Sequence, residues 1–317
     1  MFFLIMRRLG LAVVTIFIIS LIVFFGVEAL PGDAATAYLG QLATDESLKA
    51  LREEFGLNTP PLQRYVNWLG DLVRGDLGDS LSRRKPVTEL IGNRFRNTAV
   101  LAAAATIFAV PIAIVLGVIA GLTRDKWPDI TVSLVAIISM TLPGFVIATV
   151  LIYIFAIRLD WFPAVTLIPS DAPISQLLPN IVLPIITLTF VMVAHILRLV
   201  RTNMIDVMLS DYVLMARLKG VPMIKIVFQH ALPNAMLPTI NIIALTIAWL
   251  VGGVAIVETI FNYPGIGSLM IHGITDKDLP LIQGIAIILA AIFIVINLIA
   301  DLLSLFLNPR LRTERGH

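Results

Sequence analysis

The chain has 317 residues, of which 58% are hydrophobic and only 14% are charged, and its formal net charge at pH 7 is +2. Soluble globular domains carry about 25% charged residues, so this composition excludes an ordinary soluble protein and favours one embedded in a membrane. The absence of cysteine excludes disulfides and thiolate metal sites.

Six apolar runs are long enough to cross a bilayer, which requires roughly 20 mainly apolar residues per helix. Because lipid offers no partners to backbone N–H and C=O groups, each run is predicted to be a helix. We therefore expect an all-α membrane protein with six transmembrane helices. The predicted spans are Leu9–Leu30, Ala99–Leu122, Ile130–Ile157, Ile181–Val200, Ala235–Val257 and Leu281–Leu307.

The positions of Lys and Arg predict how these spans are oriented. The first run follows Arg7 and Arg8, but it is longer than the apolar core of a secretory signal, about 7–15 residues, so it is expected to stay in the protein. With both termini in the cytoplasm, the two short outer loops contain only Arg158 and Lys277, as the positive-inside rule requires. The basic charge thus reflects topology, and nucleic acid is not an expected partner.

The outer segment 31–98 is predicted to be helical and not a linker. Apolar residues recur at helical spacing in 44–56 and again in 61–74, and each pattern ends at a glycine, Gly56 and Gly75. Two interpretations remain open, a packed helical cap on the bilayer surface and a docking surface for an outside partner, and both can hold at once.

Proline and glycine predict further features of the spans. Kinks are expected at three prolines inside the second, third and fourth spans, where proline removes a helical hydrogen bond. Close helix packing is expected at a GxxxG pattern and at a pair of adjacent glycines. The residues concerned are Pro111, Pro143 and Pro184 for the kinks, and Gly117, Gly121, Gly252 and Gly253 for helix packing.

No catalytic motif occurs: the sequence lacks GxxxxGK[ST], HExxH and GxSxG, and its four histidines have no metal-ligand spacing. No catalytic residue and no metal site are predicted, and substrate-binding residues are not assigned. Asp301, within the sixth span, is interpreted as a packing or pairing residue, with a proton relay as the alternative. His195 and Arg198 are interpreted as interfacial anchors near the inner end of the fourth span.

The cytoplasmic stretch 201–235 differs from the other connections. A helix is expected over 206–222, with Ser210 or Asp211 as its cap and a stop at Gly220. Such a helix is too polar to span a membrane and too short to be stable alone. It therefore needs a partner surface, on its own bundle or on another protein.

Several motifs occur together in an order and spacing typical of one family. They are Tyr212-Val213, Ala216-Arg217-Leu218-Lys219-Gly220, His230-Ala231-Leu232-Pro233-Asn234-Ala235, Leu237-Pro238, Gln63-Arg64-Tyr65, Trp68-Leu69, Gly75-Asp76-Leu77-Gly78-Asp79-Ser80, Val257-Glu258-Thr259-Ile260-Phe261, Pro264-Gly265-Ile266-Gly267 and Asn308-Pro309-Arg310-Leu311-Arg312. Over nearly its whole length the chain resembles the binding-protein-dependent ABC permeases, in their dipeptide, oligopeptide and nickel branch. One departure is Leu214-Met215-Ala216, where that family often has Glu-Ala-Ala or Thr-Ala-Arg, so the role of that acidic or small residue is not carried over.

The resemblance implies that the 206–222 helix is a coupling helix, which rests in a groove of a cytoplasmic ATPase and transmits its movement. Gly220 would allow close backbone approach, and the charged residues would pair at the rim of the groove. The implied ATPase-coupling residues are Asp211, Tyr212, Ala216, Arg217, Lys219 and Gly220.

The same resemblance implies a permease subunit, not an enzyme, of an ATP-driven importer that moves di- or oligopeptides across the bacterial inner membrane. Its partners would be the lipid bilayer, a second homologous permease subunit, two cytoplasmic ABC ATPase subunits and a periplasmic substrate-binding protein. The chain itself would bind no cofactor, with ATP and Mg²⁺ on the ATPases. The alternatives are another cargo (a nickel chelate, glutathione, an opine or a sugar) or an ion-coupled secondary transporter, which would need ionisable groups near mid-bilayer.

The chain is expected to divide into four parts. Residues 1–30 form the cytoplasmic N-terminus and first span, and 31–98 form the periplasmic helical segment. Residues 99–307 form the five-helix transmembrane core, which includes the 201–235 coupling loop, and 308–317 form a cytoplasmic tail.

Overall fold

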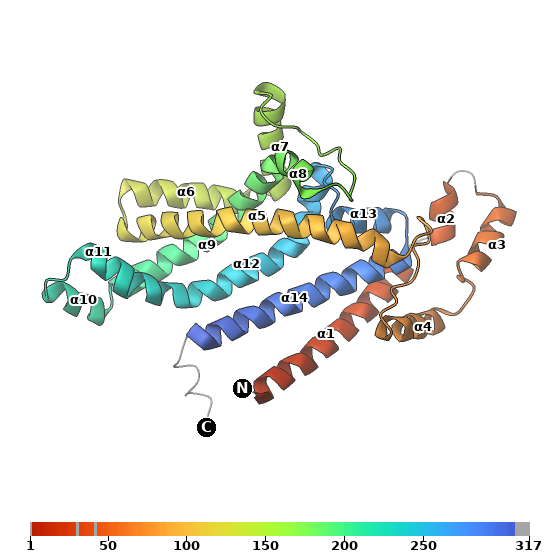
Figure 1. Ribbon diagram of the computed structural model, residues 1–317, viewed down its shortest axis with the longest axis horizontal. Helices are drawn as coiled ribbons and strands as arrows, with labels where there is room; N and C mark the ends of the chain where they lie inside the picture. Colours follow the sequence, from red (N-terminus) through yellow and green to blue (C-terminus); the bar gives the residue numbers. More distant parts are fainter. Residues whose placement is uncertain (1, 30–31, 41–42, 308–317) are drawn as a thin grey trace.

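The fold is that of a computed structural model, which describes residues 2–29, 32–40 and 43–307. Within helices, the side-chain surroundings of residues 2–5, 7–9, 251–253 and 300–307 lie outside this description. The predictions for Gly252, Gly253 and Asp301 therefore concern residues that are not described in this respect. The described chain is all-α, as predicted, with an isolated bridge between Asp79 and Pro86 and no β-strand among the described residues. Long helices run along the molecule, with short helices at its two ends and others projecting from the middle of one side (Figure 1).

Five described helices are long and apolar enough to cross a membrane, and a bent pair makes a sixth candidate span. The prediction of six spans is confirmed when the bent pair is taken as one span. The helices are α1 (Phe2–Glu28), α5 (Val87–Leu122), α9 (Val182–Met208), α12 (Leu232–Ile260) and α14 (Leu279–Leu307), and the bent pair is α6 (Trp127–Thr141) with α7 (Gly144–Leu151) and its π-helical continuation η2 (Ile152–Arg158).

The third predicted span, Ile130–Ile157, consists of two helices and not of one. Its two halves meet at an angle of 106°; α7 packs against α9 and α12, and the far end of this half projects away from the other helices (Figure 1). Leu142 at the break is extended, with φ −76° and ψ 129°, because a residue that precedes proline is driven out of the helical region. Pro143 was expected to kink the span, and the structure shows a complete break there.

Two other spans differ from their predicted limits. α5 begins at Val87 instead of Ala99, and its 36 residues make it about 54 Å long, so it extends well beyond a hydrocarbon core of about 30 Å. α9 continues past Val200 to Met208. In both cases the charged residues mark the end of the apolar stretch and do not end the helix, because a helix can continue in water.

The predicted proline kinks have different outcomes. Pro111 lies inside α5, which continues through it as a single helix. Pro184 lies in the first turn of α9, where a missing N–H leaves no hydrogen bond unmade, so the expected kink inside that span is wrong.

The predicted helices of the outer segment are confirmed as α3 (Asp45–Glu54) and α4 (Pro61–Val73), preceded by a short α2 (Ala34–Leu39). Thr44 and Ser47 form a reciprocal capping box at the start of α3. Gly56 and Gly75 follow the two helices with φ of +64° and +84°, a backbone conformation that only glycine adopts without strain.

The most extensive helix contact joins α5 to α9. A Cβ atom at Gly117 would lie 2.6 Å from Cβ of Val200, and one at Gly121 would lie 2.7 Å from Cβ of Met204. Both distances are too short for real atoms, so the two GxxxG glycines lie where the backbones of the two helices approach each other most closely.

A buried ion pair ties α6 to the same helix. The Asp129 carboxylate at the start of α6 is 2% exposed and accepts hydrogen bonds from both Nε and Nη2 of Arg201 on α9. Asp129 also accepts from the backbone N–H of Asp125 and from Ser133. A buried carboxylate with this many donors holds α6 in one position against α9.

We predict that Gly117→Ala lowers the free energy of unfolding by about 1–3 kcal/mol, because the added methyl group overfills a closed contact. Gly92 on the same helix provides the control, since a Cβ there meets nothing within 4 Å, and Gly92→Ala is expected to stabilise by up to about 1 kcal/mol. Denaturant titration of the purified protein in detergent measures both. Equal effects of the two substitutions would contradict the close α5–α9 contact.

Candidate functional site

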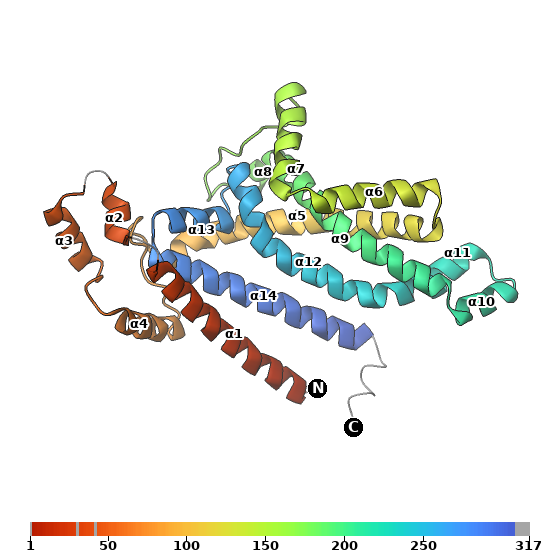
Figure 2. The ribbon, with the colours of Figure 1, turned by 180° about the vertical axis from the view of Figure 1, so that it is seen from behind.

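The connection between α9 and α12 forms a short helical hairpin at one end of the molecule (Figure 2). It consists of α10 (Asp211–Leu218), α11 (Met223–Lys225) and the π-helical segment η4 (Ile226–Ala231), which leads into α12. The single helix expected over 206–222 is therefore wrong in its limits, because Asp206 still belongs to α9. Ser210 is the N-cap residue of α10, but its hydroxyl donates to the carbonyl of Val207, 2.5 Å away, and does not cap the helix.

The end of α10 explains why a glycine follows it. The N–H of Gly220 donates to the carbonyl of Arg217, and the N–H of Val221 donates to the carbonyl of Ala216, which is the Schellman pattern. Gly220 has φ +76°, and a Cβ there would meet nothing within 4 Å. Within this chain, glycine is required by the backbone conformation and not by a close neighbour.

The hairpin exposes a large apolar surface. Only Val213 of α10 is fully buried, while Leu214, Met215 and Leu218 are 54%, 55% and 73% exposed. Tyr212, Ile224 and Phe228 add to this surface at 45%, 69% and 62% exposed. Exposed apolar residues grouped on one short helical hairpin make it a candidate surface for binding another protein.

The six residues expected to contact an ATPase all lie on α10 or its C-terminal turn. Ala216 is half-buried, and the other five, Asp211, Tyr212, Arg217, Lys219 and Gly220, are exposed. Arg217 also lines a cavity of ≈ 270 Å³ beside Gly121 and Leu122 of α5 and Met208 of α9. The C-terminal end of α10 thus lies across a cavity from the ends of the two most extensively packed helices.

At the opposite end of the molecule, the buried Glu258 of α12 joins three elements. Its carboxylate accepts hydrogen bonds from Thr98 Oγ1 of α5 at 2.5 Å and from the backbone N–H groups of Gly267 and Ser268 at 2.8 and 3.0 Å. These two N–H groups begin α13 (Ile266–Thr275), where the helix dipole favours a negative charge. A Cβ at Gly265 would lie 2.0 Å from Glu258 Oε1, which explains the glycine at this position.

Tyr263 and Asn97 complete this junction. The Tyr263 hydroxyl donates to the carbonyl of Asn97 at 2.8 Å, and the Asn97 amide donates to the carbonyls of Pro264 and Ser170. Burial raises the pKa of Tyr263, so its hydroxyl stays protonated and keeps donating. In the sequence, Glu258 directly follows the predicted span Ala235–Val257 and lies in one of the family motifs, and the glycines that follow it were the signal of its role.

A second buried carboxylate, Asp278, anchors the outer segment to the turn before α14. Its carboxylate is fully buried and accepts hydrogen bonds from the hydroxyls of Ser80 and Ser82 at 2.5 and 2.7 Å. It also accepts from the backbone N–H groups of Leu81 and Ser82. The Gly75–Ser80 string is thereby fixed to the transmembrane core, which the sequence analysis did not foresee.

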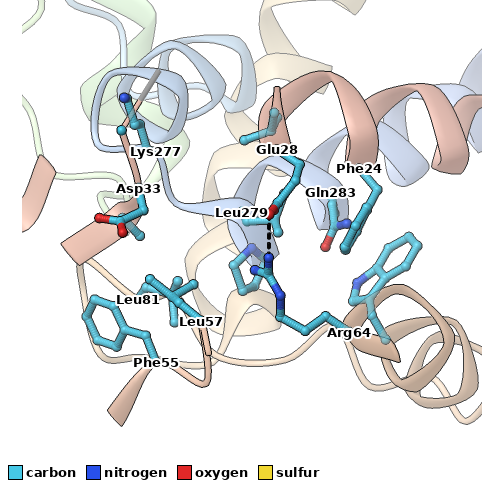
Figure 3. Close-up of a pocket in the computed structure, with 15 residues that line it drawn as sticks. Phe24, Glu28, Asp33, Phe55, Leu57, Arg64, Leu81, Lys277, Leu279 and Gln283 are labelled. Carbon is cyan, nitrogen blue, oxygen red and sulfur yellow. Dashed lines mark hydrogen bonds and ion pairs between the residues drawn. The ribbon is translucent and has the colours of Figure 1, made fainter. Parts of the chain in front are cut away.

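A cavity of ≈ 270 Å³ lies beside this anchor, between α1, α4 and α14 (Figure 3). Across it, Arg64 donates to Glu28 at 2.5 Å and so joins α4 to the end of α1. Nearby, burial alone would raise the pKa of Asp33, but hydrogen bonds from the Thr36 backbone and from Arg52 lower it. These contacts pack the outer segment against the core; they do not form a catalytic arrangement.

Among the described residues, no group of three His, Asp or Glu side chains could hold a metal ion.

Comparisons with known proteins identify the family. The family described as the inner membrane component of binding-protein-dependent transport systems matches residues 113–313. The N-terminal part of the membrane component of such systems matches residues 1–102. The chain belongs to this family.

Individual relatives agree with this result. A probable peptide ABC transporter permease protein of Sinorhizobium fredii is 32% identical over 97% of this chain and 98% of its own. A putative peptide permease protein of Brucella ovis is 34% identical, over 97% and 98%. The glutathione transport system permease protein of Escherichia coli is 34% identical, over 98% of each chain. The chain is thus a multi-pass inner-membrane permease subunit of a peptide-type ABC importer and not itself an enzyme.

We predict that Val213→Asp releases α10 from the bundle, because a carboxylate would be buried without a partner at a cost of roughly 2 kcal/mol or more. Trypsin should then cut after Arg217 and Lys219 at least about tenfold faster, since cleavage follows the population of the locally unfolded state. Leu214→Asp, at an exposed neighbouring position, is the matched control and should leave the cleavage rate unchanged. Equal rates in the two variants would show that Val213 does not hold the helix.

Proposed function

We propose that this permease imports di- or oligopeptides and that α10 is the coupling helix through which ATPase subunits drive the movement. The observation that carries the proposal is the surface of α10, which buries one side chain, Val213, and exposes an apolar face to solvent. Because this segment resembles the coupling loop of the family, we infer that an ATPase subunit binds that face. The residues proposed to contact the ATPase are the six on α10 and its C-terminal turn.

The proposed topology places both termini and α10 in the cytoplasm. Arg217, Lys219 and Lys225 lie at the α10 end, whereas the two short loops at the other end contain Arg158 and Lys277, in agreement with the positive-inside rule. The outer helices α2, α3 and α4 then lie on the periplasmic side, where a substrate-binding protein would dock. A second homologous permease and two ATPase subunits complete the proposed importer, with ATP and Mg²⁺ on the ATPases.

Peptides are the proposed cargo because of what the similar proteins are named for. Two of them are named for peptides and one for glutathione, which is itself a modified tripeptide. These cargoes share amide groups and free carboxylates, so one kind of translocation path can serve them all.

We predict that Ala216→Glu abolishes peptide uptake and leaves ATP hydrolysis in place, because a charged side chain cannot enter an apolar groove that encloses α10. The measurement is uptake and ATP turnover by the complete transporter, reconstituted in vesicles. Ala216 is a better test position than Gly220, whose positive φ would strain any substitution.

Ala43→Glu provides the control, since it adds the same charge at an exposed position at the other end of the molecule. It should leave uptake coupled to ATP hydrolysis, so that any effect changes both rates together. Normal uptake by Ala216→Glu would contradict the coupling role of α10.

A further inference from the structure

One stripe of exposed residues on α9 is polar. The residues of α9 exposed on this stripe are His195, Arg198, Thr202 and Asp206, and at 100° per residue they fall within a narrow sector of the helix. The exposed residues of α6, by contrast, include Ile130, Leu134, Val135, Ile137 and Ile138. A surface like that of α6 suits lipid, and the α9 stripe does not.

The stripe begins inside the predicted fourth span, Ile181–Val200, and continues past its end. Arg198 lies about 24 Å along α9 from its first residue, and His195 about 20 Å. Both therefore lie near one end of that span, as expected of interfacial anchors, and both are exposed. Charged residues within a span face a bundle interior or water, because exposure to lipid is costly.

A groove between α9 and α12 receives this stripe. Its volume is ≈ 440 Å³, and its lining includes His195, Arg198 and Thr202 from α9 and Leu245, Thr246 and Trp249 from α12. The imidazole of His195 lies beside the Trp249 indole, with ring centroids 6.1 Å apart. The groove thus combines a cation, an exposed aromatic face and apolar walls.

Arg198 is free to bind a ligand. No described residue forms a hydrogen bond or an ion pair with its guanidinium, whereas Arg201, one turn further along α9, is held by the buried Asp129. The Nδ1 of His195 lies 3.0 Å from the carbonyl of Val191, so it donates there and leaves Nε2 directed away from this bond. Two arginines three residues apart therefore have different roles, one structural and one unpaired.

We propose that this groove is a binding site in the translocation path for the terminal carboxylate of the transported peptide, and that Arg198 binds that carboxylate. A guanidinium matches a carboxylate through two parallel hydrogen bonds, and Trp249 offers a surface for an apolar or aromatic side chain of the cargo. The inference rests on the proposed function, because it names the group of the cargo that the path recognises.

The first test asks whether the groove contains water in the assembled transporter. The chain has no native cysteine, so single cysteines give no background. Thr202→Cys and Leu245→Cys are expected to react with a charged, water-soluble thiol reagent in membranes, whereas Leu134→Cys on α6 is expected to stay unreactive. If the groove cysteines are as unreactive as the α6 cysteine, lipid or a partner subunit covers the groove and the inference is wrong, whatever the cargo.

The second test compares uptake of one peptide with a free C-terminal carboxylate and the same peptide with a C-terminal amide. The same binding protein serves every variant, so its own preference cancels. In Arg198→Gln, uptake of the free acid relative to the amide is expected to fall about tenfold, the effect of losing a hydrogen bond to a charged group. Arg198→Lys, which keeps the charge but loses the planar fork, should fall in between.

Arg74→Gln removes a positive charge from an exposed position on the outer segment and should leave the ratio unchanged. An unchanged ratio in Arg198→Gln overturns the inference and leaves the proposed function standing. A wild-type complex that carries neither peptide overturns the proposed function, and the assignment of the carboxylate with it.

Discussion

At Gly117 and Gly121, α5 meets α9 with no room for a single additional carbon atom. This contact determines much of the rest of the structure. It commits the face of α9 that contains Leu197, Val200 and Met204 to helix packing, and α6 is then fixed to the same helix by Asp129 and Arg201. Because α5 and α6 cover this side of α9, the polar stripe of α9 lies on the opposite side, where it contacts neither of these two helices.

The two ends of the bundle are built on different principles. At the end opposite α10, Glu258 and Asp278 are buried carboxylates whose oxygens accept several hydrogen bonds each, so the connections there are fixed in one arrangement. At the α10 end, a single buried side chain and one glycine-terminated turn hold a helix whose surface is mostly exposed. A rigid end opposite a loosely held helix suits the proposed function, in which the protein is moved from one side.

The sequence predicted the elements whose cause is local. Apolar runs located the spans, and Gly56, Gly75 and Gly220 were placed where a helix ends because each takes a positive φ. What it did not predict depends on distant partners. Thr98 and Glu258 are 160 residues apart, and Ser80 and Asp278 are 198 apart, so no local pattern reveals these pairs. Pro111 and Pro143 show the same limit, because one stays within a continuous helix and the other breaks its span.

The length of α5 has a mechanical consequence. One helix without a break reaches from the cavity beside Arg217 to the hydrogen bond between Thr98 and Glu258. Between Leu122 and Thr98 the helix is about 36 Å long, so a tilt of a few degrees at one end becomes a shift of about 2–3 Å at the other. A force applied at the α10 end would thus be transmitted to the opposite end through one continuous helix. It would not depend on a series of contacts between separate helices.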